Sequence, residues 1–237
     1  MSSIQDLVIL LPARNEADGI GEVIDRIPHE SIISMGYNPR VVVSDGHSSD
    51  STREISRSKG ALILEQKGEV GKGNGVREAI EFIFSSPEFD VGAVIMLDAD
   101  ATYRPEDIPL FLRELETSDV VWGSRLRGEM EEKAMSRINR IGNILLSMSA
   151  SIMFLKRTTD LCTGYWCFKN DAITKLPLTA SGFNLEADMF TSVCKSRLST
   201  REIAINYDHR EGESNLKWYR DGPRIFFMVL KKRFFLA

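Results

Sequence analysis

The sequence contains no apolar run of the roughly 20 residues that a membrane-spanning helix needs. Its start, MSSIQDLVILLPARNE, lacks the basic segment and long apolar stretch of a signal peptide, so we expect none. There are three cysteines and three histidines, and they show no metal-binding spacing. An odd number of cysteines favours free thiols in a reducing compartment. The net charge of −4 provides no basic field and argues against nucleic acid as a partner.

The chain also lacks internal repeats and low-complexity linkers, so one domain accounts for most of its 237 residues. Hydrophobic residues make up 43% and charged residues 27%, which is ordinary for a globular protein. We predict an α/β domain over residues 1–215 and a C-terminal amphipathic helix over residues 216–237.

Strand and helix patterns alternate through the first half of the chain. Five apolar segments predict strands at residues 6–11, 40–45, 61–66, 91–97 and 118–125. Helical periodicity lies between them at residues 12–27, 48–60, 71–86 and 104–116. Continuous apolar strands separated by helices predict a mostly parallel sheet with helices on both faces.

The rhythm changes after residue 125. A long helix is predicted over residues 136–155, an extended segment over 160–170 and a helix over 184–197. A strand over 200–208 and a helix over 216–235 follow.

Four acids fall where predicted strands end. Glu16 follows the first strand, Asp45 ends the second, and Asp98 and Asp100 end the fourth. Ligands of open parallel sheets bind beyond the carboxyl ends of the strands, so these acids are expected at one rim. Like charges there repel one another, and a hard cation such as Mg²⁺ or Mn²⁺ would neutralise them. An isolated D-x-D is otherwise a turn with a solvent-facing acid.

An ordered set of motifs covers roughly residues 7–216. It comprises VILLPARNEADGI, VVVSDGHSSDST, GKGNGVREAI, VIMLDADATYRPEDI, VVWGSRL, SRINRIGNILLS, DLCTGYWCFK, GFNLEADM and HREGESNL. The chain thereby resembles family 2 glycosyltransferases, most of all the branch with dolichol-phosphate mannosyltransferase and other polyprenyl-phosphate sugar transferases. The resemblance implies a GT-A fold, which is a Rossmann-like α/β fold, and an inverting sugar transfer from a UDP- or GDP-linked donor.

The resemblance also implies roles for individual residues. The nucleotide-sugar positions are Pro12, Arg14, Glu16, Asp45, Lys72 and Asp98. The metal positions are Asp98 and Asp100, and the catalytic positions are these two acids together with Arg125 and Arg210. Ser44 and Thr102 depart from the acid and the glutamine that the family often has, which leaves the sugar and the nucleotide open.

The predicted helix over residues 136–155 carries two stripes. One is apolar (Ile138, Ile141, Leu145, Met148, Ile152 and Leu155), and a polar one lies beside it (Arg140, Asn143, Ser147 and Ser151). The apolar stripe fits either an ordinary core-facing helix or a surface for a lipid chain. A lipid phosphate needs cations and no base, since its second pKa is about 6. The expected acceptor residues are Arg137, Arg140, Asn143 and Glu186.

The C-terminal stretch mixes four phenylalanines with Lys231, Lys232 and Arg233. Such a helix suits the interface of an anionic membrane, and it equally suits docking on the domain or on a partner subunit. We therefore expect a cytoplasmic protein at the face of a membrane, acting on dolichyl or polyprenyl phosphate. The alternatives are a soluble phosphorylated acceptor such as a glycerate phosphate, a catalytically weak nucleotide-sugar-binding module and a nucleotidyltransferase.

Overall fold

Seven strands form one mixed sheet in the computed structural model, which describes residues 4–209 and 218–235. The strands are β1 (Gln5–Ala13), β2 (Tyr37–Asp45), β3 (Leu62–Glu65), β4 (Val91–Met96), β5 (Val120–Ser124), β6 (Trp166–Lys169) and β7 (Thr200–Ala204). Their order is β3-β2-β1-β4-β6-β5-β7. Only β6 runs antiparallel to its neighbours among these strands. The prediction of a mostly parallel sheet is confirmed.

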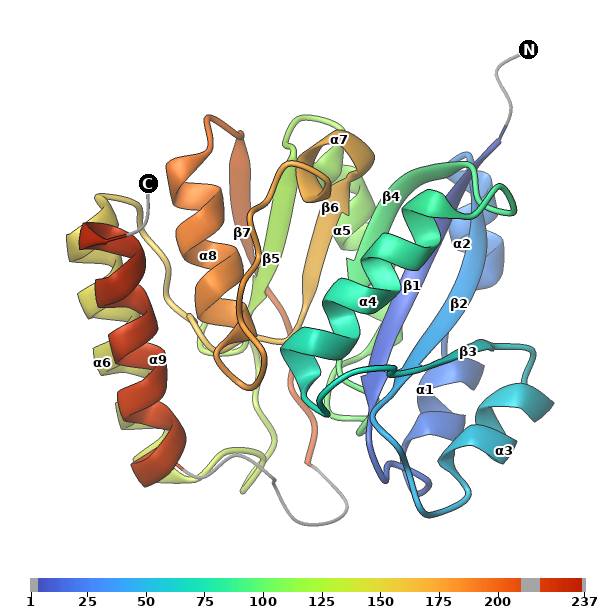
Figure 1. The fold of residues 1–237 in the computed structure, drawn as a ribbon, viewed down its shortest axis with the longest axis horizontal. Helices are drawn as coiled ribbons and strands as arrows, with labels where there is room; N and C mark the ends of the chain where they lie inside the picture. The colour runs from blue at the N-terminus through green and yellow to red at the C-terminus, as the bar shows by residue number, and fades with distance from the viewer. Residues whose placement is uncertain (1–3, 210–217, 236–237) are drawn as a thin grey trace.

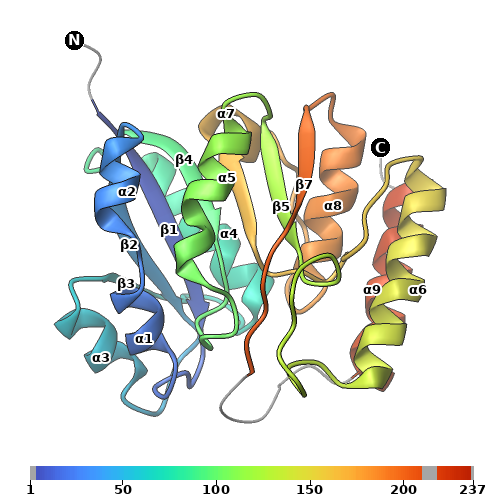
Figure 2. The ribbon, with the colours of Figure 1, turned by 180° about the vertical axis from the view of Figure 1, so that it is seen from behind.

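Helices cover both faces of this sheet (Figures 1 and 2). One face carries α4 (Lys72–Ser85), α8 (Leu185–Lys195) and the short α7 (Asn170–Ile173). The opposite face carries α1 (Ile20–Asp25), α2 (His29–Ser34) and α5 (Ile108–Leu115), which follows a 3₁₀ turn at Pro105–Asp107. The helix α3 (Thr52–Ser58) packs beside α1. The sheet is buried between two apolar layers, which is why β1 and β4 are nearly continuous runs of apolar residues.

Two helices lie side by side at one end of the molecule, beyond α8 (Figure 1). They are α6 (Arg137–Phe154) and α9 (Trp218–Phe234). α6 begins where the Ser136 hydroxyl accepts a hydrogen bond from the Asn139 N–H at 3.2 Å, and it ends at Leu155 in the left-handed conformation. Within the described residues, no helix is long and apolar enough to cross a bilayer.

The orientation of α6 corrects one interpretation of its sequence. Its apolar stripe does not face the core, because Ile141 and Leu145 are each 59% exposed. The buried residues of the helix are Asn143, Ser147 and Ala150. The helix therefore packs through its polar stripe and leaves the apolar one outside.

Candidate active site

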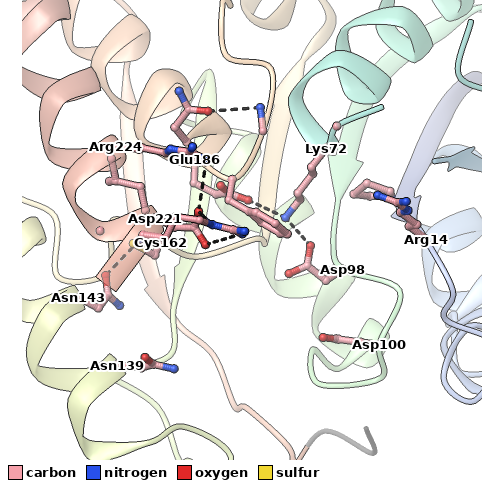
Figure 3. A pocket seen from close by; sticks show the side chains of 18 of the residues that line it. Arg14, Lys72, Asp98, Asp100, Asn139, Asn143, Cys162, Glu186, Asp221 and Arg224 are labelled. Atoms are coloured by element: carbon pink, nitrogen blue, oxygen red, sulfur yellow. Dashed lines mark hydrogen bonds and ion pairs between the residues drawn. The ribbon is translucent and has the colours of Figure 1, made fainter. Parts of the chain in front are cut away.

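The carboxyl ends of β1 and β4 open into a cleft with a volume of about 2140 Å³. The two strands are parallel neighbours with Leu10 opposite Met96, so the loops that follow them lie next to each other. The cleft continues past α4 to the facing sides of α6 and α9, as the close view in Figure 3 shows. It exceeds the size of about 300–1000 Å³ that is usual for one small ligand, and it has room for two substrates.

Three charged side chains meet in the middle of the cleft. Lys72 Nζ lies 2.6 Å from Asp98 Oδ1 and 2.6 Å from Glu186 Oε1 (Figure 3). Burial by itself lowers the pKa of Lys72, but the two carboxylates outweigh burial and raise it above its ordinary value, Asp98 more than Glu186. For Glu186 burial acts in the opposite direction and raises the pKa of the carboxyl group, while the charge of Lys72 lowers it; the net pKa of Glu186 is raised. Lys72 is thus one cation shared by two acids, and it offsets one of their two negative charges.

Asp98 and Asp100 both line the cleft. Gly164 makes room for the first, because a Cβ there would lie 2.6 Å from Asp98 Oδ2. Asp100 Oδ1 accepts hydrogen bonds from the Thr102 N–H at 3.2 Å and the Thr102 hydroxyl at 2.5 Å. Ala101, between Asp100 and Thr102, has a φ of 60°, in the left-handed region. The chain turns at this residue from β4 toward α5.

The donor set fits a hard divalent cation. Two carboxylates of one turn line the cleft, and the described residues hold no group of three or more His, Cys, Asp or Glu side chains that would form a complete metal cage. Mg²⁺ and similar ions are typically held by one or two carboxylates together with substrate phosphates. Asp98 and Asp100 therefore suit an ion whose remaining ligands are the oxygens of a bound diphosphate.

The end of β1 contributes Pro12 to the cleft, and the loop that follows contributes Arg14 and Glu16. Arg14 is exposed and makes no ion pair with any described residue, which suits contact with an anion. The loop is fixed from behind, since the Glu16 N–H donates to the Thr52 hydroxyl at 2.9 Å.

Asp45 lies deeper than its predicted role suggests. Its side chain is fully buried, it lies outside the lining of the cleft, and its carboxylate accepts hydrogen bonds from the Ser48 N–H at 3.1 and 3.3 Å. The neighbouring Ser44 and Gly46 line the cleft instead. Contact between Asp45 and a nucleotide stays a prediction, and in this structure the carboxylate orders the loop that follows β2.

Arg125 is held rigidly at the edge of the cleft. Its Nε and Nη2 lie 2.7 Å from the two oxygens of Asp160, a bidentate pair between buried side chains. Burial lowers the pKa of Arg125, but Asp160 more than compensates and raises it well above its ordinary value. The guanidinium also lies 5.1 Å from the ring centre of Tyr207.

Asn143 completes this network from α6. Its side-chain amide donates to Asp160 Oδ1 at 2.6 Å, and its carbonyl oxygen accepts from the Cys162 N–H at 3.2 Å. Asn143 lines the cleft with both ends of its amide engaged, so it holds Asp160 and thereby Arg125 in place.

The other predicted cations are placed differently. Arg137 and Arg140 are exposed on the first turn of α6 and lie outside the lining of the cleft, to which the same turn contributes Ser136 and Asn139. Arg210 lies outside the described residues.

Several residues of the site were not predicted from the sequence. Asp160, Gly164 and Tyr207 act through partners far along the chain, and no local spacing indicates such partners. The side chains that α9 brings into the cleft, such as Arg224 and Phe227, were expected only on a separate helix.

The mixed sheet with a cleft at the carboxyl ends of β1 and β4, lined by two acids of one turn, defines a GT-A-like glycosyltransferase fold. Residues 8–176 match the profile of glycosyl transferase family 2, and the chain belongs to this family. It is a glycosyltransferase, as predicted from the ordered motifs.

Curated archaeal and bacterial relatives extend over most of the chain. Glycosyltransferase AglJ of Haloferax volcanii is 34% identical over 227 residues, which are 94% of this chain and 71% of the relative. The dolichyl-phosphate hexose transferase of the same organism is 31% identical, with 97% of this chain and 94% of the relative covered. The undecaprenyl-phosphate mannosyltransferase of Micrococcus luteus is 26% identical, with 89% and 87% covered.

Solved structures share the fold. Glucosyl-3-phosphoglycerate synthase from Mycobacterium tuberculosis, in complex with Mn²⁺, UDP and glucosyl-3-phosphoglycerate, superposes with a TM-score of 0.73. It is 19% identical, and the match covers 97% of this chain and 80% of that one. At this identity the similarity establishes the fold alone.

Proposed function

We propose that the protein transfers a sugar from a UDP- or GDP-linked donor to dolichyl or polyprenyl phosphate, with inversion at the anomeric carbon. The carrying observation is that one cleft joins the acids at the end of β4 to α6 and α9, whose outer sides carry exposed apolar residues. Relatives named for transfer to dolichyl and undecaprenyl phosphate support this assignment.

The donor end of the cleft is proposed at β1, β4 and α4. Asp98 and Asp100 would hold Mg²⁺ or Mn²⁺, which supplies positive charge to a diphosphate leaving group when bound. Lys72 and Arg14 line the same cleft beside these acids and would supply further positive charge to that diphosphate (Figure 3). Pro12 and Glu16 line the wall where the nucleoside would lie, and Asp45 supports the loop behind it.

The acceptor end is proposed beside Arg125 and Asn143. An acceptor phosphate is already anionic near pH 7, so its oxygen can attack the anomeric carbon without a general base. The new bond is to that oxygen, and the bond to the donor's β-phosphate breaks, so the nucleoside diphosphate leaves. Arg125, fixed by Asp160, would orient the attacking phosphate, and Glu186 would hold Lys72 in reach of the donor.

A phosphorylated soluble acceptor is the second candidate. It is favoured by the fold shared with glucosyl-3-phosphoglycerate synthase, whose structure holds UDP and Mn²⁺. A lipid acceptor would place the protein at the cytoplasmic face of a membrane, in contact with the bilayer or with a membrane subunit.

The test is sugar transfer from radiolabelled UDP- and GDP-sugars to three acceptors in detergent: polyprenyl phosphate, the corresponding alcohol and 3-phosphoglycerate. The proposal predicts a lipid-linked product from the phosphate only. Product on 3-phosphoglycerate alone would refute the lipid acceptor and support the soluble one.

A variant in the cleft separates the two substrates. A Cβ at Gly142 would meet no atom within 4 Å, although this residue lines the cleft, so Gly142→Leu extends into open space. We expect a KM for the acceptor raised about tenfold or more, with the KM for the donor unchanged. Ser149→Leu, on the same helix but outside the lining, is the matched control.

A further inference from the structure

The outer side of α6 is an apolar row along the whole helix. Its exposed fractions are 56% for Ile138, 59% for Ile141, 59% for Leu145, 55% for Met148, 71% for Ile152 and 89% for Leu155, just past the end of the helix. Single exposed apolar residues are ordinary, but a contiguous row of large ones marks a surface that is covered by something else.

The helix cannot bury this row by rotating, because its polar side is fixed. Ser147 Oγ accepts from the Leu161 N–H at 2.8 Å, and Ser151 Oγ accepts from the Thr158 N–H at 3.0 Å. Asn143 holds the buried carboxylate of Asp160 at 2.6 Å. Turning the apolar row inward would leave these buried polar groups without partners.

The neighbouring α9 presents a row in which cations and aromatic rings alternate. Arg224, Phe227, Lys231 and Phe234 follow one another at helical spacing, and all four are exposed. The opposite side of the helix is buried through Ile225, Val229 and Lys232.

The charge of these two helices opposes that of the rest of the chain. α6 has two arginines and no acid, and α9 has five cations and one acid. Together they carry a charge of +6 in a chain whose net charge is −4, so the remainder carries −10. Basic and apolar groups are concentrated on the same end of a molecule that is otherwise acidic.

Both rows border the same cleft. Leu145 of the α6 row lines it, and so do Arg224, Phe227 and Lys231 of the α9 row. A surface that covered the two rows would lie at the mouth of the cleft on its acceptor side.

We propose that the α6 and α9 rows, here called the docking face, bind the surface of an anionic lipid bilayer. The docking face consists of Ile138, Ile141, Leu145, Met148, Ile152 and Leu155 with Arg224, Phe227, Lys231 and Phe234. Apolar side chains enter the interface and the cations meet lipid phosphates, which is how amphipathic helices lie on membranes. The docking face rests on the proposed function, because a lipid acceptor is the reason to bind a bilayer. Its test does not require sugar transfer.

The test is co-sedimentation of the full chain with vesicles of phosphatidylcholine, with and without phosphatidylglycerol. We expect binding to the anionic vesicles, weakened about tenfold or more by Ile141→Gln together with Ile152→Gln. Neither residue lines the cleft. Ile33→Gln is the control, since Ile33 on α2 is 56% exposed and far along the sheet from the docking face.

A second pair of variants tests the charges. Arg224→Glu and Lys231→Glu on α9 should abolish the preference for anionic vesicles, whereas Arg57→Glu, an exposed cation on α3, should leave it intact.

Equal binding of the wild type and the α6 variant would overturn the proposal. So would a wild-type dimer in sedimentation velocity that the α6 variant converts to a monomer without a change in vesicle binding, because the docking face would then join two copies. Vesicle binding without any transfer to polyprenyl phosphate in detergent would support the docking face and count against the proposed function alone.

Discussion

Lys72 and Asp98 form an ion pair of 2.6 Å between the first turn of α4 and the end of β4. The pair stands where a diphosphate and its cation are proposed to bind, and Glu186 shares the same ammonium at 2.6 Å. Lys72 therefore reduces the repulsion between these acids before the donor arrives and can contact its phosphates afterwards. This links the glycine-rich turn before α4 to the acids of β4, two motifs that are 26 residues apart.

Replacing Lys72 tests this link. Lys72→Met leaves Asp98 and Glu186 without their shared cation and removes a charge from the donor site, so kcat/KM for the donor should fall about 10²- to 10³-fold. The measurement is initial rate against donor concentration. Lys59→Met, which removes the Lys59–Asp25 pair of 2.5 Å at the surface, is the control and should stay near the wild-type value. Similar kinetics for both variants would contradict the role of Lys72.

Asn143 should matter for stability as well as for activity. Asn143→Ala removes the 2.6 Å hydrogen bond to the buried Asp160 carboxylate, and we expect a loss of about 1–3 kcal/mol in the free energy of unfolding. Urea denaturation measures it, with Ser149→Ala on the same helix expected within about 0.5 kcal/mol of the wild type. A variant that loses activity without losing stability would assign Asn143 to acceptor contact alone.

The C-terminal helix is joined to α8 by a buried ion pair. Lys232 Nζ lies 2.6 Å from Asp188 Oδ1, and both side chains are buried. Lys232→Met leaves an unpaired buried carboxylate and should destabilise the protein by about 3–5 kcal/mol. Adding Asp188→Asn should recover part of that loss, since it removes the charge. Lys231→Met, its exposed neighbour, is the control, and equal melting of the two single variants would refute the pairing.

The thiols should be inert at neutral pH. Burial raises the pKa of Cys162 and Cys194 to about 12. Both thiols therefore remain protonated at pH values at which an ordinary cysteine has lost its proton. At pH 8 the thiolate fraction falls from about a quarter for an ordinary cysteine to about 10⁻⁴. Alkylation of the native protein should therefore be about 10³-fold slower than that of the protein in urea, and should quicken about tenfold per pH unit between pH 8 and pH 11. Rapid native labelling at pH 8 would contradict these shifts.

Much of the fold could be predicted from the sequence. The strands β1 to β5 are apolar runs bounded by turn residues, and α4 and α6 are long periodic segments, so their existence followed from local pattern. The insertion of β6 antiparallel between β4 and β5 could not be predicted, because strand order depends on contacts between residues far apart in the chain. The short α2 was missed, since its six residues show little periodicity.

Part of the candidate site could likewise be predicted from the sequence, and part could not. Glu16, Asp98 and Asp100 could be placed at one rim from the positions of the strand ends alone, whereas Arg14 was expected there only from the family resemblance. The burial of Asp45 and the exposure of the apolar row of α6 could not be predicted from the sequence. The α6 sequence has two stripes, and only the partners of Asn143 and Ser147 on a distant loop decide which stripe is buried.

The most direct test of the account is calorimetric titration of UDP and of GDP into the protein, with Mn²⁺ or with a chelator. The wild type should bind one nucleoside diphosphate at least about tenfold more tightly with Mn²⁺. Asp100→Asn should lose this gain, and the surface variant Asp25→Asn should keep it. Equal binding with metal and with chelator, unchanged in Asp100→Asn, would contradict the assignment of the acids of β4 to a cation that holds the donor's diphosphate.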